Sequence, residues 1–273
     1  MTPILAFDLE TIPDVEGLRR LRPQWAPLGD AELVDQAFAE RRERTGGSDF
    51  LPLHQHRIVA VGCAYRDDSG FKVRCLGAPT DGEQRLVRDF FRIIERNTPQ
   101  LVSWNGGGFD LPVLNYRAMV HGVAAARFWD TGDDDRDFRY NNYLSRYHAR
   151  HTDLMDVLAM YQGRGAAPLD DLARLCGFPG KLGMGGDKVW NAWCEGQINA
   201  IRNYCETDVV NTYLLYCRFQ RLRGVLGEAQ YAAEMNVVRE SLAALDAPHW
   251  REFLAAWEHP AAAADHPPAR AAS

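Results

Sequence analysis

The segment Pro3-Ile-Leu-Ala-Phe-Asp-Leu-Glu10 is typical of a β-strand that ends in two acidic residues. Side chains alternate between the two faces of a strand, so Asp8 and Glu10 leave the same face of the predicted sheet. The other strand residues are apolar, with Ile4 and Ala6 on the acidic face and Leu5, Phe7 and Leu9 on the opposite one. Two carboxylates at this spacing can share a divalent cation. Solvated acids at a strand end give the same pattern, so the pair alone is a weak signal.

A second acidic motif, Asn105-Gly-Gly-Gly-Phe-Asp110, follows an apolar strand predicted over 101–104. The three glycines permit a tight turn and a close approach of the backbone. A plain alternative is a glycine-rich loop in which Asp110 caps the next helix.

A third motif, Tyr204-Cys-Glu-Thr-Asp208, lies in a helix predicted over 198–216. Tyr204 and Asp208 are four residues apart and therefore share one face of this helix, which is otherwise apolar. Each residue alone could be an ordinary buried side chain with a hydrogen-bond partner. Several carboxylates converging on one place instead indicate a cation, since burying an unpaired carboxylate costs free energy.

The remaining periodicity predicts an α/β fold, with a mixed central sheet flanked by helices. Segments 58–65 and 71–75 form a strand hairpin around the turn residues Asp67-Asp-Ser-Gly70, and 83–97 is an amphipathic helix.

The 273 residues are predicted to form one domain over 1–258, with its core at about 3–224. Residues 13–56 are expected to be a partly helical surface insertion and 228–258 a helical extension. The tail 259–273 has no periodicity and is expected to be disordered.

The net charge of −6 argues against tight, non-specific duplex binding, but it is compatible with a site that neutralises phosphate locally. The six cysteines form no C-x-x-C pair, so no zinc or redox motif is indicated. Apolar runs are too short for a membrane span, and we expect a cytoplasmic protein without membrane contact.

Together, the three motifs resemble those of the DEDD superfamily of exonucleases. The middle motif resembles the proofreading domain of family B DNA polymerases, and the chain is similar to stand-alone bacterial exonucleases related to that domain. Tyr204 stands four residues before Asp208, as in the tyrosine branch of the superfamily, DEDDy. The resemblance covers about residues 3–224 and implies an RNase H-like, DnaQ-like fold.

The resemblance also implies a catalytic set of Asp8, Glu10, Asp110, Tyr204 and Asp208. Asp8, Glu10 and Asp208 are expected to hold one Mg²⁺ or Mn²⁺ ion, and Asp8 helps to hold a second. Asp110 would contact an ion directly or through water, and Tyr204 would orient the attacking water. The implied substrate is the 3′ end of single-stranded DNA or RNA, with DNA favoured, and the product is a nucleoside 5′-monophosphate.

Substrate contacts follow from the same resemblance. Thr11 and Asn105 are expected to contact the terminal sugar and backbone, and Leu9 and Phe109 either stack on the terminal base or pack in the core. Basic and aromatic residues also alternate over 138–150, where covering of the sheet edge is favoured over nucleic-acid binding.

Three lesser candidates are assigned structural roles. Asp153 is expected to cap a helix rather than to bind a metal, and Lys181 and Lys188 are expected to be solvated loop residues.

Two other functions remain open at this stage. An RNase H-like endonuclease uses similar acid pairs, although the Tyr-x-x-x-Asp spacing favours the exonuclease. A non-catalytic nucleic-acid-binding module is the second alternative. A role in proofreading or DNA repair is an expectation from the resemblance alone.

Overall fold

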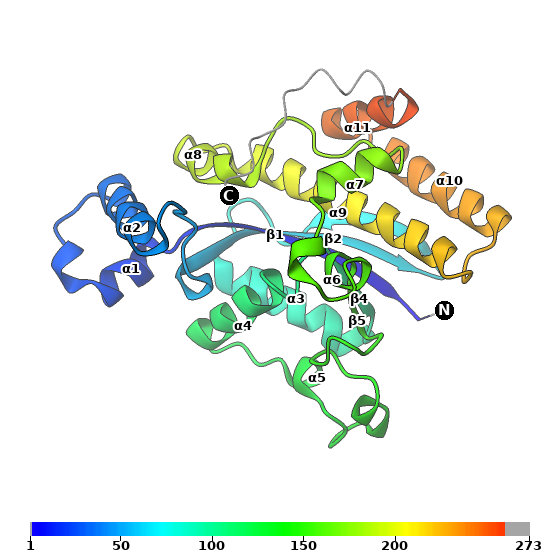
Figure 1. Ribbon diagram of the computed structural model, residues 1–273, viewed down its shortest axis with the longest axis horizontal. Helices are drawn as coiled ribbons and strands as arrows, with labels where there is room; N and C mark the ends of the chain where they lie inside the picture. The colour runs from blue at the N-terminus through cyan, green and yellow to red at the C-terminus, as the bar shows by residue number, and fades with distance from the viewer. Residues whose placement is uncertain (1, 260–273) are drawn as a thin grey trace.

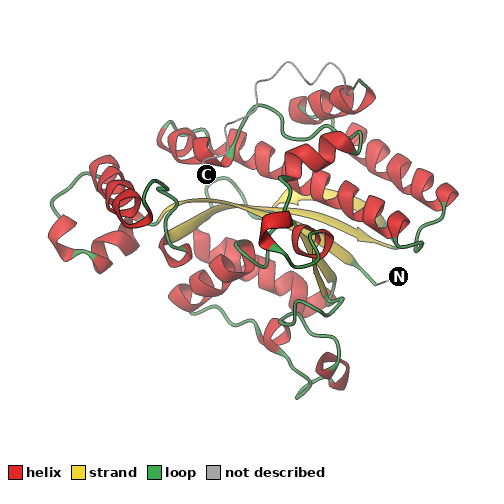
Figure 2. Cartoon of the chain, in the orientation of Figure 1, coloured by secondary structure: helices red, strands yellow, loops and turns green. Residues whose placement is uncertain are grey.

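In the computed structural model, which describes residues 2–259, a five-stranded sheet lies between two layers of helices (Figures 1 and 2). The strands are β1 (Ile4–Pro13), β2 (His56–Asp67), β3 (Gly70–Cys75), β4 (Gln100–Ser103) and β5 (His151–Asp153). Their order is β3-β2-β1-β4-β5. β2 runs antiparallel to β1 and β3, whereas β4 is parallel to β1 and β5. The predicted mixed α/β sheet is confirmed.

The two faces of β1 enter different cores, as the alternation of its side chains requires. Leu5, Phe7 and Leu9 pack with α3 (Glu83–Asn97) and α4 (Asp110–His121). Ala6 packs instead with residues of α9 (Ile198–Leu222). The face that carries Asp8 and Glu10 is therefore the one covered by α9.

α9 lies directly on the sheet because one strand residue has no side chain. A Cβ at Gly62 of β2 would be 2.9 Å from both the carbonyl oxygen and the Sγ of Cys205. α10 (Glu228–Ala244) and α11 (Pro248–Glu258) pack on the same layer, with Trp250 and Phe253 fully buried. Helices therefore fill the predicted extension.

The segment between β1 and β2 contains α1 (Val15–Leu21) and α2 (Asp30–Thr45) and projects from one end of the sheet (Figure 1). It has a small core of its own, formed by Leu18, Leu33, Val34, Ala37 and Leu51. A buried ion network fixes its start, because the Arg117 guanidinium of α4 contacts Asp14 at 2.5 Å and Glu83 at 2.5 and 2.8 Å.

The sequence did not predict β5, whose three residues are too few to show a strand period. The irregular segment before it contains α5 (Ala126–Trp129). Phe138 and Tyr143 in this segment are buried, and the Tyr143 hydroxyl donates to the Pro99 carbonyl at 2.7 Å. These two rings therefore pack in the core beside α3 and α4, whereas Tyr140 and Tyr147 of the same stretch are exposed.

The remaining helices are short. They are α6 (Leu154–Leu158), α7 (Leu169–Leu175), α8 (Val189–Cys194) and the 3₁₀ helices Pro23–Trp25, Leu53–Gln55, Arg136–Arg139, Gly163–Gly165 and Gly186–Lys188. Within residues 2–259, no helix is both long and apolar enough to span a membrane. All but the first residue of the predicted disordered tail lies outside the described residues.

Candidate active site

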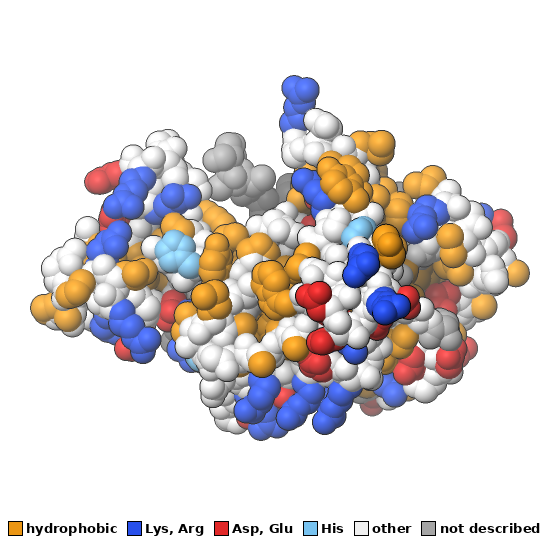
Figure 3. Space-filling view, turned by 90° about the horizontal axis from the view of Figure 1, so that it is seen from below, with side chains coloured by type: hydrophobic (Ala, Val, Ile, Leu, Met, Phe, Trp, Pro, Cys, Tyr) orange, Lys and Arg blue, Asp and Glu red, His pale blue; other side chains and the backbone are white. Residues whose placement is uncertain are grey.

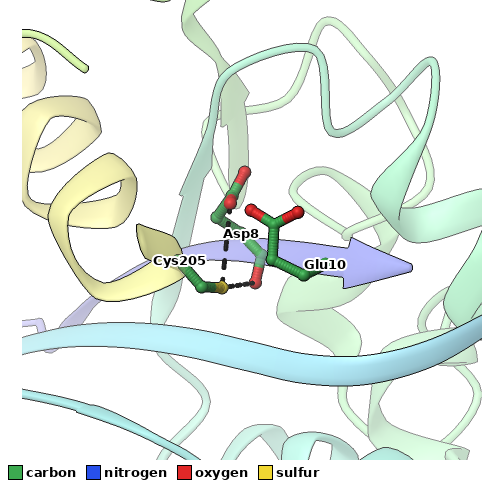
Figure 4. Close-up of side chains that lie close together, drawn as sticks. All are labelled: Asp8, Glu10 and Cys205. Atoms are coloured by element: carbon green, nitrogen blue, oxygen red, sulfur yellow. Dashed lines mark hydrogen bonds between the residues drawn. The ribbon is translucent and has the colours of Figure 1, made fainter. Parts of the chain in front are cut away.

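Asp8 and Glu10 project from the same face of β1, beside Cys205 of α9 (Figure 4). Carboxylate oxygens of both residues lie within 4.8 Å of each other and of the Cys205 Sγ. Glu10 is buried and Asp8 is partly buried. The pairing of β1 with β2 is irregular immediately after Glu10, where the register shifts before Thr11.

Two further carboxylates join this pair from other elements. Burial raises the pKa of Asp8 well above its usual range, and repulsion from Asp110 and Asp208 raises it further. The pKa of Glu10 is raised in the same way by burial, Asp8 and Asp208. β1, α4 and α9 therefore bring four acidic side chains into one electrostatically coupled group.

Asp110 is the first residue of α4, and its carboxylate accepts a hydrogen bond from the Leu9 backbone at 2.9 Å. This contact ties the start of α4 to β1. Burial raises the pKa of Asp110 to about 7, despite this hydrogen bond.

The glycine loop before Asp110 is held by Asp153, at the end of β5. The Asp153 carboxylate accepts from the Asn105 backbone at 2.9 Å and from the Gly107 backbone at 2.8 Å. It also caps α6, as predicted, by accepting from Asp156. The loop passes so close to β4 that a Cβ at Gly106 would be 2.3 Å from the Ser103 Oγ.

Lys181 enters the site, so its prediction as a solvated loop residue is wrong. Its ammonium group donates to the Tyr204 hydroxyl at 2.6 Å and pairs with the Asp208 Oδ2 at 3.0 Å. The Lys181 backbone donates to Asp170 at 2.7 Å, and the preceding Gly180 is held by Asn211 of α9. These contacts between distant segments place Lys181, and no local sequence pattern predicts them. Lys188, by contrast, is exposed as predicted.

The donor atoms fit a divalent cation that prefers oxygen ligands. The Oδ1 of Asp208 is buried and has no hydrogen-bond partner within the described part of the chain. Burial also raises the pKa of Asp208, although Lys181 opposes this shift. A bound divalent cation would give this oxygen a partner and would stabilise the ionised form of the neighbouring carboxylates. Mg²⁺ and Mn²⁺ favour such oxygen ligands.

Cys205 lies within reach of the acidic pair but is a poor ligand for such a cation. Its sulfur accepts from the Gly62 backbone at 3.1 Å, and burial raises the pKa of the thiol well above its usual range. Mg²⁺ and Mn²⁺ also prefer oxygen ligands to sulfur.

The four predicted substrate contacts are placed differently. Thr11 hydrogen-bonds His56 at 2.9 Å, Asn105 is exposed, and the Phe109 ring is partly exposed. The Leu9 side chain is only 5% exposed and packs in the core, which favours the packing alternative for this residue. His56, which sequence reasoning missed, lies at the start of β2 in no recognisable motif.

A family model described as "Predicted 3'-5' exonuclease related to the exonuclease domain of PolB" matches residues 48–257. This range contains Asp110, Lys181, Tyr204 and Asp208 and begins after the acidic pair of β1.

The chain is also similar to longer archaeal enzymes. It is 24% identical over 139 residues to a DNA polymerase of Archaeoglobus fulgidus, covering 50% of this chain and 17% of the polymerase. It is 31% identical over 126 residues to DNA polymerase 1 of Aeropyrum pernix, covering 44% of this chain and 11% of that protein. The solved family B DNA polymerase of Pyrobaculum calidifontis has a TM-score of 0.48 at 19% identity, covering 78% of this chain and 24% of that one. The chain thus spans less than a fifth of the length of these two curated relatives.

The match of the family model over most of the chain shows the family. This protein belongs to the predicted 3′–5′ exonucleases related to the exonuclease domain of PolB.

Proposed function

We propose that this protein is a divalent-cation-dependent 3′–5′ exonuclease. It would remove nucleoside 5′-monophosphates one at a time from the 3′ ends of single strands, with DNA favoured over RNA. The observation that supports this proposal is the convergence of four carboxylates from β1, α4 and α9 beside Tyr204. Such a group has no evident structural purpose, since its members repel one another.

Asp8, Glu10 and Asp208 would hold one cation, and Asp8 and Asp110 would help to hold a second. Bound Mg²⁺ or Mn²⁺ would lower the pKa of water and neutralise charge on the phosphate. The orphaned Oδ1 of Asp208 and the raised pKa values of the acidic side chains support this assignment.

Tyr204 would orient the attacking water rather than remove its proton. Burial and the nearby carboxylate of Asp208 raise the pKa of Tyr204 far above its usual range, so the phenol stays protonated. Lys181 can only donate, so the Tyr204 oxygen accepts from it, and the phenolic proton is directed at Asp208. When Asp208 holds a cation, the phenol would instead donate this proton to the water that attacks the terminal phosphodiester.

Thr11 would accept a hydrogen bond from the sugar of the last nucleotide. The Nε2 of His56 lies 3.1 Å from the Leu51 carbonyl, which can only accept, so Nε2 carries the proton of the neutral ring. Burial lowers the pKa of His56, which favours that neutral form. Nδ1 then accepts the Thr11 proton, and the Thr11 oxygen is left as an acceptor that suits a free 3′-hydroxyl.

Degradation of labelled strands tests the proposed function. Single-stranded DNA and RNA of one sequence, labelled at the 5′ end, are incubated with magnesium, manganese or EDTA. We expect a ladder that shortens by one nucleotide at a time, requires the metal, and is absent with Asp8→Ala and Asp208→Ala. Asp133→Ala, which removes an exposed acid in a distant loop, is the matched control.

Each other outcome has a definite meaning. Internal fragments would indicate an endonuclease, and binding without cleavage would indicate a nucleic-acid-binding module. Equal activity of the wild type and Asp208→Ala would refute the site itself.

A further inference from the structure

Three aromatic rings pack together where the insertion meets the sheet. We call them the aromatic cluster: Phe50 of the insertion, His56 at the start of β2 and Phe109 before α4. Their ring centroids are 5.1 Å apart for Phe50 and His56, 5.8 Å for Phe50 and Phe109, and 5.4 Å for His56 and Phe109. These separations are those of favourable aromatic pairs.

The aromatic cluster adjoins the candidate active site at two points. Phe109 directly precedes Asp110, and His56 hydrogen-bonds Thr11, which directly follows Glu10. A single-stranded nucleic acid whose 3′ end lies at the acidic side chains would therefore reach these rings next.

Phe50 is unusual within the aromatic cluster because 52% of its surface is exposed. Its backbone is nevertheless held, since its carbonyl accepts from the Arg41 Nε at 2.8 Å and its amide donates to the Ser48 Oγ at 3.3 Å. The next residue, Leu51, is anchored in the core of the insertion. A large ring that is exposed but held in place is preorganised to contact a ligand. Hydrophobic side chains also gather across the middle of the face shown in Figure 3.

We propose that Phe50 stacks on a base of the single strand upstream of its terminal nucleotide, while Phe109 contacts the terminal base. This inference rests on the proposed function and adds that the insertion determines how much strand the enzyme grips. A nucleobase is the fitting occupant because the ring continues the surface that leads from the acidic group, and every base offers a flat face to it. Phe50 is thus a substrate-positioning residue without a part in the chemistry.

Two substrates separate this role from catalysis. One is a ten-nucleotide single strand, and the other is the p-nitrophenyl ester of thymidine 5′-monophosphate, which has no upstream base. We expect Phe50→Ala to raise the KM for the strand about tenfold with little change in kcat, because stacking contributes to uniform binding. Hydrolysis of the ester should be unchanged, and Phe50→Trp should restore the KM.

Trp129→Ala, which removes an aromatic side chain of α5 that is 54% exposed, is the matched control and should leave both substrates unaffected. An unchanged KM in Phe50→Ala would overturn the proposal. So would an equal loss on both substrates, since that would show a role in folding.

A binding measurement tests the stacking apart from turnover. Fluorescence anisotropy in the Asp8→Ala background compares a normal strand with strands whose second, third or fourth nucleotide from the 3′ end is abasic. At one of these positions, the abasic change and Phe50→Ala should each weaken binding about tenfold, and the two together no more than either alone. Additive losses at all three positions would overturn the proposal. If the wild type hydrolyses neither substrate, the proposed function fails, and this coupling alone decides whether Phe50 stacks.

Discussion

Lys181 and Asp208 form an ion pair of 3.0 Å inside the candidate active site. Burial by itself lowers the pKa of Lys181, but Asp208, Asp8 and Glu10 together raise it above its usual range. The protein thus places one fixed positive charge among four carboxylates that would otherwise repel each other. This explains how the fold tolerates the acidic group, and it makes Lys181 a competitor of any cation that binds there.

Lys181→Met tests this competition. Without the ammonium group, the carboxylates attract a divalent cation more strongly, so we expect Mn²⁺ to bind about tenfold more tightly, or about 1.4 kcal/mol. Turnover should fall, because Tyr204 loses the partner that fixes its hydroxyl. Isothermal titration with Mn²⁺ measures the affinity, and Asp208→Asn should show the opposite change. Weaker metal binding in Lys181→Met would contradict the assigned role.

Tyr204→Phe separates metal binding from the orientation of water. The substitution removes one hydroxyl and leaves all four carboxylates, so we expect the Mn²⁺ affinity to be retained. The kcat on single-stranded DNA should fall about tenfold to a hundredfold, because this is the effect on a rate of losing one hydrogen bond to a charged group. Loss of metal binding together with kcat would show instead that the tyrosine builds the cation site.

Cys205→Ala tests whether the thiol belongs to the ligand set. Since Mn²⁺ prefers oxygen ligands to sulfur, we expect its affinity to change by less than about twofold. Gly62→Ala is the contrasting variant. Its new Cβ would collide with the Cys205 carbonyl, so α9 must move, and we expect a loss of about 1–3 kcal/mol of stability with weaker metal binding. A large loss of metal affinity in Cys205→Ala would make the sulfur a ligand.

Local periodicity accounts for what the sequence predicted well. The period-two pattern of β1 correctly placed Asp8 and Glu10 on one face, because strand geometry leaves no other choice. The amphipathic helix predicted over 83–97 is α3, which has the same bounds, and its five buried apolar residues form its apolar face: Leu86, Val87, Phe90, Phe91 and Ile94. Regular elements with a strong apolar stripe need little tertiary information.

Contacts between distant segments account for what was missed. Lys181 reaches the site only because Asn211 and Asp170 hold the loop before α8 against α9 and α7. β5 exists because β4 offers it a parallel edge, and its own three residues carry no strand signal. The local sequence near Lys181 or β5 does not encode these pairings, so pattern analysis had no means to find them.

Arg117→Met should destabilise the whole fold. The guanidinium is the common partner of Asp14 and Glu83, both buried, and its removal leaves Asp14 without its cationic partner and Glu83 with His121 alone. Breaking a buried ion pair in this way costs about 3–5 kcal/mol, which we expect as the loss in the free energy of unfolding. Urea denaturation measures it, with Arg85→Met as the control, since the Arg85 side chain is 55% exposed although it also pairs with two acids. Equal stability of the two variants would show that the network contributes little.

His151→Gln should reduce the loss of stability in acid. His151 of β5 is buried, its Nε2 lies 2.8 Å from the Ser103 Oγ, and burial lowers its pKa from 6.5 to about 4. Between these two pKa values, His151 is therefore protonated in the unfolded chain and neutral in the folded chain. Stability from this group is present above pH 6.5 and is lost as the pH falls through 6.5 toward 4.

The size of this effect follows from the two pKa values. Between pH 7.5 and pH 5, His151 should account for about 2 kcal/mol of the decrease in the free energy of unfolding. Gln keeps a polar group facing the Ser103 hydroxyl but cannot take up the proton. The decrease in the free energy of unfolding should therefore be smaller by that amount in the variant over the same pH range. Urea denaturation in EDTA at pH 7.5, 6 and 5 measures both proteins with the acidic group in the same state. Equal decreases in the free energy of unfolding of the wild type and the variant would mean that His151 becomes charged in the folded protein. Its Nε2 would then donate the hydrogen bond to the Ser103 hydroxyl.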